Sequence, residues 1–374
     1  DIVEVHMEEV EGDNKHFSVN YPNLYKDIKV GECILVDDGY LELSVISIDK
    51  SKKIITTKAE NAHVLKNRKG INVPGVKLHL DFISPKDYSD IVWGCKNNVD
   101  FIAASFVRRA SDIQEIKNIM KYNNNKNIQI IAKIENKEGV KNIDDRYDIF
   151  ELMEKLDVPL LLHGEVVDPV IDIFDREKVF IERYLQKIVQ DYPDLKVVLE
   201  HITTADAVQF VDAASEKVAA TITPQHLLLN RNDLLVGGIR PHNFCLPVLK
   251  RNTHQEALRT AVASGSNKYF LGTDSAPHEK HRKESACGCA GCYSAWSALE
   301  LYTQLFEELN VLDKLDDFAS LHGAQFYGLP RNQETVTLIK ESWTVPEEII
   351  LPNGKPIVPF WGGLKVHWKV KPNA

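Results

Sequence analysis

Three apolar stretches in the second half of the chain each end in a side chain that can ligate a metal: His163, His201 and Asp274. In a (β/α)₈ barrel the catalytic groups come from the C-terminal ends of parallel strands, so three such endings predict one shared site. A polar strand end in a turn is the ordinary explanation for any single one of them. Three residues in the same structural position favour a metal site.

Residues 1–73 have the turn signals of β structure. Two β-rich runs meet at Asp37-Asp-Gly, which indicates a hairpin, and residues 53–58 predict a further strand. We therefore expect a small all-β domain at the start of the chain.

From Pro74 onward, strand patterns alternate with helix patterns. Strands are expected within 99–106 and 128–135, and helices begin at the capping residues Ser84 and Ser111. This alternation implies a parallel sheet, so the predicted class is α/β, with a partial (β/α)₈ barrel of the TIM-barrel type.

Four motifs before about residue 145 resemble pyruvate kinase in content and order. They are Val36-Asp-Asp-Gly, Arg68-Lys-Gly-Ile-Asn-Val-Pro-Gly75, Ala103-Ala-Ser-Phe-Val-Arg and Ile131-Ala-Lys-Ile-Glu-Asn-Lys-Glu-Gly139. The resemblance covers that family's small β domain and two strands of its barrel. It implies magnesium and potassium as cofactors, with Lys133 stabilising an enolate, Glu135 ligating magnesium and Lys69 contacting a nucleotide phosphate.

The chain departs from this family at two points. The Gly-Asp-Leu-Gly-type strand with the second metal-binding acid does not follow residue 139, and the strands that bind potassium and phosphate are not found before residue 1. A salt-bridged strand end is therefore the alternative explanation for Lys133 and Glu135.

From about Arg146 the chain resembles the bacterial single-enzyme type of dihydroorotase. The motifs are His163-Gly-Glu-Val, Asp172-Ile-Phe-Asp-Arg-Glu177, Glu200-His-Ile-Thr-Thr204, Ala220-Thr-Ile-Thr-Pro-Gln-His-Leu227, Gly237-Gly-Ile-Arg-Pro-His242, Cys245-Leu-Pro-Val-Leu-Lys-Arg251, Gly272-Thr-Asp-Ser-Ala-Pro-His278 and Arg282-Lys-Glu-Ser-Ala-Cys-Gly-Cys-Ala-Gly-Cys292. The resemblance implies a binuclear zinc amidohydrolase that closes carbamoyl aspartate into dihydroorotate and reopens it.

Site roles follow from this resemblance by motif. His163 and His201 would ligate zinc, and Asp274 would ligate the other metal while acting as general base or acid. The substrate would be held by His278 and by the backbones of Leu246 and Ala290.

The family's first strand carries a His-x-His pair, and no such pair occurs in this chain. Its substrate-binding arginine and asparagine and its carbamylated lysine are missing as well. If the strand within 128–135 lies directly before the strand that ends at His163, Lys133 would take the place of that lysine.

The net charge of −9 argues against nucleic acid as a partner. No apolar run approaches transmembrane length and the first residues do not form a signal peptide, so a membrane partner is not expected.

The six cysteines do not form a disulfide framework, which indicates a reducing, cytoplasmic compartment. The three at 287–292 are interpreted as thiols without a metal. Small molecules are the expected substrates, and the dihydroorotase resemblance favours a homodimer.

Residues 294–318 predict a long amphipathic helix in the outer ring of the barrel. Its expected apolar face consists of Trp296, Leu299, Leu301, Leu305, Phe306 and Leu309. The remaining tail predicts short strands and turns.

The expected domains are 1–73, 74–145 and 146–374, with a junction of the two families within 142–148. Two barrel strands precede this junction and four follow it, so we expect an open sheet with edges and an exposed interior face.

Three functions stay open: a dihydroorotase-like amidohydrolase, a pyruvate-kinase-like phosphotransferase, and a chimera without turnover. The last is favoured for the intact chain because both catalytic sets are truncated. Whether the chain is a natural fusion, an engineered recombinant or two fragments read as one is left open.

Overall fold

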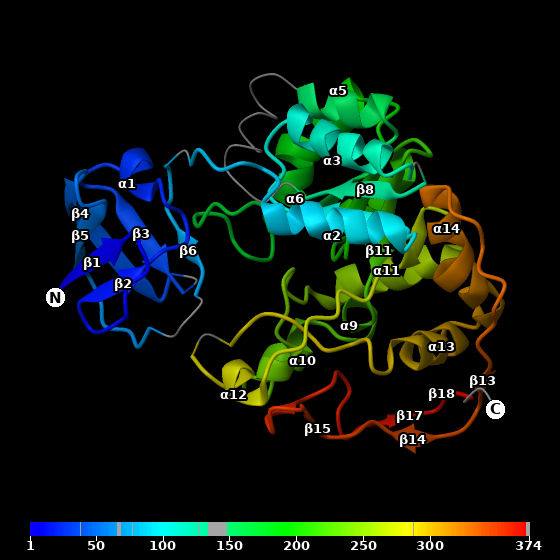
Figure 1. Cartoon of the computed structure of the whole chain (residues 1–374). Helices are drawn as coiled ribbons and strands as arrows, with labels where there is room; N and C mark the ends of the chain where they lie inside the picture. The colour runs from blue at the N-terminus through cyan, green and yellow to red at the C-terminus, as the bar shows by residue number, and fades with distance from the viewer. Residues whose placement is uncertain are drawn as a thin grey trace. The chain divides into compact units, whose positions relative to one another are not determined.

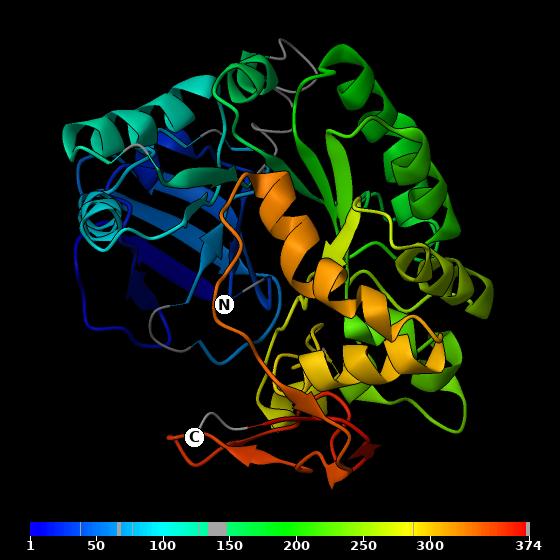
Figure 2. The same ribbon diagram turned by 90° about the vertical axis from the view of Figure 1, so that its right-hand side faces the viewer.

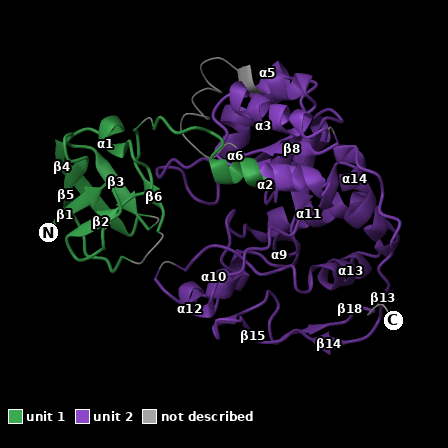
Figure 3. Ribbon diagram, viewed as in Figure 1, with its two compact units in different colours: residues 1–90, 136–141 green, residues 91–135, 142–374 purple. Residues whose placement is uncertain are grey.

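The computed structural model describes residues 1–37, 39–65, 69–76, 78–125, 127–133, 148–286 and 288–371, without the side chains of residues 148 and 149. Its two compact units are coloured in Figure 3: the first comprises Asp1–Asp90, and the second contains the described residues from Ile91 onward. The boundary between the units falls inside helix α2 (Pro85–Lys96). The finer division at residues 73 and 145 stays a prediction.

The first unit is a six-stranded sheet in the order β2-β1-β5-β4-β3-β6, with the short helix α1 (Leu24–Asp27) (Figure 1). Its strands are β1 (Ile2–His6), β2 (His16–Ser18), β3 (Cys33–Val36), β4 (Leu41–Asp49), β5 (Ile54–Ala59) and β6 (Ile71–Asn72). The predicted hairpin is confirmed, since β3 and β4 pair antiparallel. Side chains point alternately to the two faces of the sheet along each strand, and one of these faces is buried. Val5, Ile34, Leu43 and Ile55 are fully enclosed on it.

The second unit is built on a parallel sheet in the order β12-β11-β10-β9-β8-β7 (Figure 1). Its strands are β7 (Phe101–Ala104), β8 (Gln129–Ala132), β9 (Leu160–His163), β10 (Val197–Glu200), β11 (Val218–Ile222) and β12 (Tyr269–Leu271). Each strand therefore lies beside the next one in the chain. The α/β class and the division into two strands before the junction and four after it are confirmed.

The two helix starts predicted from capping residues have different outcomes: Ser84 caps its helix, whereas the helix expected to begin at Ser111 begins at Ala110, with Arg109 as N-cap and no side-chain cap. Ser84 and Asp87 cap α2 reciprocally, because the Asp87 amide donates to Ser84 Oγ (3.1 Å) and the Ser84 amide to Asp87 Oδ2 (3.0 Å). The other helices are α3 (Ala110–Tyr122), α5 (Asp148–Lys155), α6 (Arg176–Phe180), η1 (Ile181–Leu185), α7 (Gln186–Asp191), α8 (Ala205–Ala213), α9 (Pro224–Leu228), α10 (Arg231–Leu235), η2 (Pro241–Asn243), α11 (Asn252–Ser264), α12 (Lys280–Lys283), α13 (Ala298–Glu308), η3 (Leu312–Lys314), η4 (Asp317–Leu321) and α14 (His322–Tyr327). Among the described residues, no helix combines the length and the apolar character needed to cross a membrane.

The expected single helix over 294–318 is wrong. Helix α13 ends at Glu308, and Asn310 then takes a left-handed φ of 59°, which an α-helix cannot continue through. The chain resumes as the short helices η3 and η4. Leu301, Leu305 and Phe306 are buried as predicted, whereas Trp296 precedes the helix and is exposed.

The C-terminal tail forms three two-stranded antiparallel sheets, as predicted. Their strands are β13 (Leu338–Ile339) with β18 (Lys369–Val370), β14 (Trp343–Thr344) with β17 (Lys365–Val366), and β15 (Ile349–Ile350) with β16 (Pro356–Ile357).

The interior face of the parallel sheet is covered, which corrects the expectation of an exposed face. Val198, Ala219 and Phe270 are buried there next to Leu161 of β9, and Phe326 and Tyr327 pack against them. The two covering aromatic residues belong to α14, the orange helix lying against the strands in Figure 2.

The ring of Tyr327 contacts both edge strands of this sheet. Its centroid lies 5.4 Å from that of Phe101 in β7 and 5.8 Å from that of Phe270 in β12. The edges of a flat six-stranded sheet would be roughly 24 Å apart, at about 4.8 Å per strand. The sheet is therefore curled into an open barrel, with an aromatic side chain where the missing strands would close it.

We expect Tyr327→Ala to lower the free energy of unfolding by about 2–3 kcal/mol, somewhat less than for a fully buried aromatic residue. The matched control is Tyr122→Ala, because Tyr122 is 82% exposed on α3. Urea unfolding followed by circular dichroism measures both. Equal effects of the two substitutions would show that Tyr327 does not hold the edges together.

Candidate functional site

Neighbouring strands bring two of the predicted site residues together. His163 ends β9 opposite Glu200 of β10, and His201 follows Glu200 directly. His201 has a φ of 42°, so the chain turns sharply where the strand stops. As a result His163 Nδ1 and His201 Nε2 face each other at 3.2 Å, with ring centroids 4.8 Å apart.

Glu165 orients the His163 ring. Its Oε2 lies 3.1 Å from His163 Nε2, and its side chain is buried with Oε1 3.8 Å from the Lys250 ammonium. When His163 donates Nε2–H to this carboxylate, Nδ1 keeps its lone pair and points it towards His201. A carboxylate behind a histidine is a common support for a metal ligand.

His201 is enclosed more tightly than its partner. Burial, reinforced by the nearby His163, lowers the pKa of His201 to about 3, so the ring is neutral at physiological pH. Its Nδ1 is a buried nitrogen without a hydrogen-bond partner among the described residues. Neutral imidazole is the form that binds metals.

Two acids lie near this pair of histidines. Asp274 follows β12 with a φ of 42°, and burial raises the pKa of its carboxyl, partly offset by the charge of His163. Glu200 accepts a hydrogen bond from Thr221 Oγ1 (2.5 Å), and burial, together with the charge of Asp274, raises its pKa. A carboxyl with a raised pKa releases its proton at a higher pH than an ordinary aspartic or glutamic acid does.

The two histidines fit a shared zinc ion. At Zn–N distances of about 2.0–2.1 Å, two nitrogens of a tetrahedral site lie roughly 3.3 Å apart, and the observed separation is 3.2 Å. Asp274 does not complete a set of three metal ligands with these histidines. Among the described residues, the three metal-ligand side chains whose ligand atoms all lie within 4.8 Å of one another are Glu4, His6 and His16. The site as described therefore offers two close imidazole nitrogens with a spacing that fits zinc.

The predicted substrate-binding residues lie in two loops that meet. His278 Nε2 donates to the Ala290 carbonyl at 3.0 Å, and Leu246 precedes a cis proline with its side chain partly exposed. Gly291 has a φ of 142°, and a Cβ there would lie 2.7 Å from Ala276 Cβ, so the close approach of these loops requires glycine.

A buried lysine organises the same loop. Lys283 is 3% exposed, and its ammonium donates to the carbonyls of Phe244 (2.7 Å), Cys289 (2.8 Å) and Gly291 (2.7 Å). These contacts could not be inferred from the sequence, because all three acceptors are backbone carbonyls of segments without regular structure.

The thiols of Cys245 and Cys292 are buried and contact each other. A hydrogen bond with Cys245 and the charge of Lys283 lower the pKa of Cys292, while the same contact and burial raise that of Cys245. Cys287, the first member of the predicted cluster, lies outside the described residues.

Sequence analysis missed one residue of the site, Thr221 in β11. Its Oγ1 accepts from the His201 amide at 2.7 Å and donates to Glu200, which links the ends of β10 and β11. A threonine inside an apolar strand was the available signal. Glu165 also belongs to the site, since it contacts His163 Nε2, whereas Glu200 bonds to Thr221.

The residues of the pyruvate-kinase resemblance fall in separate units. In the first unit Lys69 Nζ pairs with Asp37 Oδ1 at 2.7 Å, and His63 contacts the same carboxylate. In the second unit Lys133 Nζ lies 3.5 Å from Ser105 Oγ. Glu135 lies outside the described residues.

The condition for the Lys133 hypothesis is met, since β8 pairs with β9 directly through Ala132 and Leu160. The role of Lys133 beside the histidines stays a prediction.

Comparison with known proteins supports the composite origin of the chain. The family model of the pyruvate kinase barrel domain matches residues 2–186. The dihydroorotase of Shewanella frigidimarina is 73% identical over 233 residues, which are 62% of this chain and 68% of that protein. The dihydroorotase of Marinomonas sp. is 67% identical over the same shares.

Two solved structures resemble the fold. Dihydroorotase from Campylobacter jejuni matches with a TM-score of 0.60 and 29% identity, covering 73% of this chain and 77% of that one. Dihydroorotase from Saccharomyces cerevisiae in complex with 5-fluoroorotic acid matches with a TM-score of 0.63 and 28% identity, covering 76% and 86%.

We expect His226 to make the metal-free chain less stable in acid. His226 is buried between Thr223 Oγ1 (2.7 Å) and the Pro247 carbonyl (2.8 Å), and burial lowers its pKa to about 4. Between about pH 6.5, the usual histidine pKa, and pH 4, the unfolded chain takes up a proton that the folded chain does not. The free energy of unfolding therefore falls with falling pH in this window, by up to about 1.4 kcal/mol per pH unit.

Urea unfolding at a series of pH values measures this slope. His226→Gln should reduce it by the contribution of one histidine, with the part due to His201 remaining, and His281→Gln, which changes an exposed histidine, should leave it unchanged. The same slope in all three proteins would contradict the assignment.

Proposed function

The chain belongs to the dihydroorotase family through its C-terminal part, and from this we propose that this part carries a zinc-dependent cyclic amidohydrolase site of the dihydroorotase type. The proposed substrates are carbamoyl aspartate and dihydroorotate. The observation that carries the proposal is the His163–His201 pair, with nitrogens 3.2 Å apart and Glu165 behind one ring.

His163 and His201 would hold one zinc ion. When bound, zinc lowers the pKa of a water molecule and polarises the amide carbonyl. Asp274 supplies the proton-exchanging group, because its buried carboxyl has a raised pKa and lies within electrostatic range of His163. The loops of Leu246, His278 and Ala290 would bind the substrate carboxylate, with Lys283 fixing their shape.

The site is reduced compared with a binuclear one. The sequence has no His-x-His pair for a second zinc, and the described residues place two histidines, not three close ligands, around the first. We therefore propose that the chain binds zinc here but turns over far more slowly than its relatives. A homodimer and a cytoplasmic location stay predictions that rest on the resemblance.

Zinc binding tests the metal site. The metal-free chain is reloaded with zinc, dialysed and measured by elemental analysis. We expect His201→Ala to lose one equivalent relative to the parent chain, because half of the histidine pair is gone. His281→Ala serves as the control and should lose none. Equal zinc content in all three proteins would refute the assignment of the ligands.

Turnover tests the proposed reaction. Loss of one metal removes several kcal/mol of transition-state stabilisation, so dihydroorotate hydrolysis should be roughly 10³-fold slower than for the Shewanella frigidimarina relative. Asp274→Asn should abolish the remaining zinc-dependent rate. A rate equal to that of the relative would contradict the reduced site, and a residual rate unaffected by Asp274→Asn would contradict the proton-exchanging role.

The pyruvate kinase match over residues 2–186 supports a second candidate, a phosphotransferase that uses Lys133 and Lys69. A lactate-dehydrogenase-coupled assay with phosphoenolpyruvate, ADP, magnesium and potassium tests it. We expect no activity, because the strand carrying that family's second metal-binding acid is absent from the sequence. Activity that is lost in Lys133→Met would establish the alternative.

A further inference from the structure

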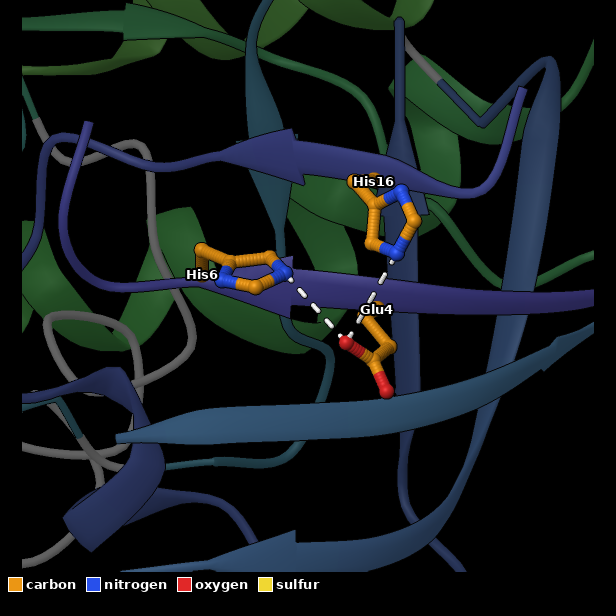
Figure 4. Close-up of side chains that lie close together, drawn as sticks. All are labelled: Glu4, His6 and His16. Atoms are coloured by element: carbon orange, nitrogen blue, oxygen red, sulfur yellow. Dashed lines mark ion pairs between the residues drawn. The ribbon is translucent and has the colours of Figure 1, made fainter. Parts of the chain in front are cut away.

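Two paired strands of the first unit bring two histidines and a carboxylate onto one face of its sheet. Glu4 and His6 are two positions apart on β1, so they share a face, while Val5 between them is buried in the core. Strand β2 pairs parallel to β1 with His16 opposite Glu4. Figure 4 shows both imidazole rings directed at the Glu4 carboxylate.

The three side chains already lie at distances close to those of a metal site. Glu4 Oε2 is 3.4 Å from His6 Nε2 and 3.9 Å from His16 Nε2. Among the described residues, this is the group of three metal-ligand side chains whose ligand atoms all lie within 4.8 Å of one another. Ligands of a tetrahedral zinc ion are roughly 3.3 Å apart, so the Glu4–His6 pair already has about this spacing, and the Glu4–His16 pair would have to close by about 0.6 Å.

The ligand nitrogens of both histidines are directed by their surroundings. His6 Nε2 is a buried atom without a hydrogen-bond partner among the described residues, and it points at the cluster. His16 Nδ1 is held by Asp13, whose Oδ1 and Oδ2 lie at 3.0 and 3.1 Å. Asp13 in turn accepts from the amides of Lys15 (2.7 Å) and His16 (2.8 Å). This leaves His16 Nε2 facing Glu4.

This arrangement has the chemistry of a zinc site. Two imidazoles and one carboxylate form a ligand set that zinc uses, and a carboxylate behind a ligating histidine is its usual support. Calcium and magnesium prefer oxygen ligands, so imidazoles select against them. Simple ion pairing is a weak alternative, because Glu4 and His16 are 39% and 40% exposed and such pairs contribute little.

We propose that Glu4, His6 and His16 form a binding site for a zinc-class divalent cation in the first unit, with Asp13 as the residue that positions His16. The bound ion would tie the edge strand β2 to β1. The site is independent of the pair His163–His201, since it is built entirely from other residues of a different unit.

The experiment uses the full chain carrying His201→Ala, which disables the other proposed zinc site. Zinc is titrated by calorimetry, and cobalt is used as a spectroscopic probe, because tetrahedral cobalt absorbs visible light and reports its ligands. The variants tested in this background are Glu4→Gln, His6→Ala, His16→Ala and Asp13→Asn. His79→Ala is the matched control, since His79 is an exposed histidine of the same unit that pairs with one carboxylate, Asp27.

We expect one zinc equivalent in the background chain. Asp13→Asn should weaken binding about 10–100-fold, as for other outer-shell partners, and removal of a ligand should weaken it by more than about 100-fold. His79→Ala should change nothing. Circular dichroism of each variant without metal verifies that the fold is retained, and Glu4→Gln and Asp13→Asn, which alter exposed groups conservatively, keep the test decisive if a histidine variant unfolds.

Two results would overturn the proposal: no zinc bound by the His201→Ala chain, or the same affinity in Glu4→Gln and His79→Ala. Neither result bears on the dihydroorotase-type site. That site fails separately, if the parent chain and His201→Ala bind equal amounts of zinc.

Discussion

The contact of one tyrosine ring with both edges of the parallel sheet determines the geometry of the second unit. Eight strands close a (β/α)₈ barrel through continuous hydrogen bonding, and this sheet has six. Tyr327 packs between Phe101 and Phe270, which keeps the two edges near each other. Curling the sheet brings the strand ends inward. In a flat sheet the ends of β9 and β12 would be about 14 Å apart, three strand spacings, whereas the curled sheet brings these ends closer to each other.

The two parts of the chain fit together because parallel pairing depends on the backbone and on a buried apolar face. Strand β8 comes from the part that resembles pyruvate kinase and β9 from the part that resembles dihydroorotase, yet they pair through Ala132 and Leu160. Both families use the same barrel architecture, and an architecture does not determine a reaction. Function therefore has to be argued from the side chains at the strand ends, where His163, His201 and Asp274 all derive from the second part.

Sequence alone was informative where the causes are local. Apolar runs ending in polar residues predicted six strands and placed His163 and His201 at neighbouring strand ends, and Ser84 predicted the start of α2. It failed where the cause lies far away along the chain. Tyr327 carries no local sign that its ring will meet Phe101, a residue more than two hundred positions earlier. The cluster around Glu4 depends on β1 and β2 pairing in parallel, which alternating residues do not reveal.

Lys283 shows how a single charge can specify the shape of a loop. Its ammonium directs three protons to three carbonyls that lie in different directions, and no described loop side chain takes part in these bonds. Arginine offers a flat fan of donors that matches coplanar acceptors, so it cannot substitute for a tetrahedral group here. An acetylated lysine would retain one proton for three acceptors and lose its charge. The three carbonyls thus surround the ammonium ion as the ligands of a chelate surround a metal, and this conformation lasts only as long as the Lys283 nitrogen stays protonated.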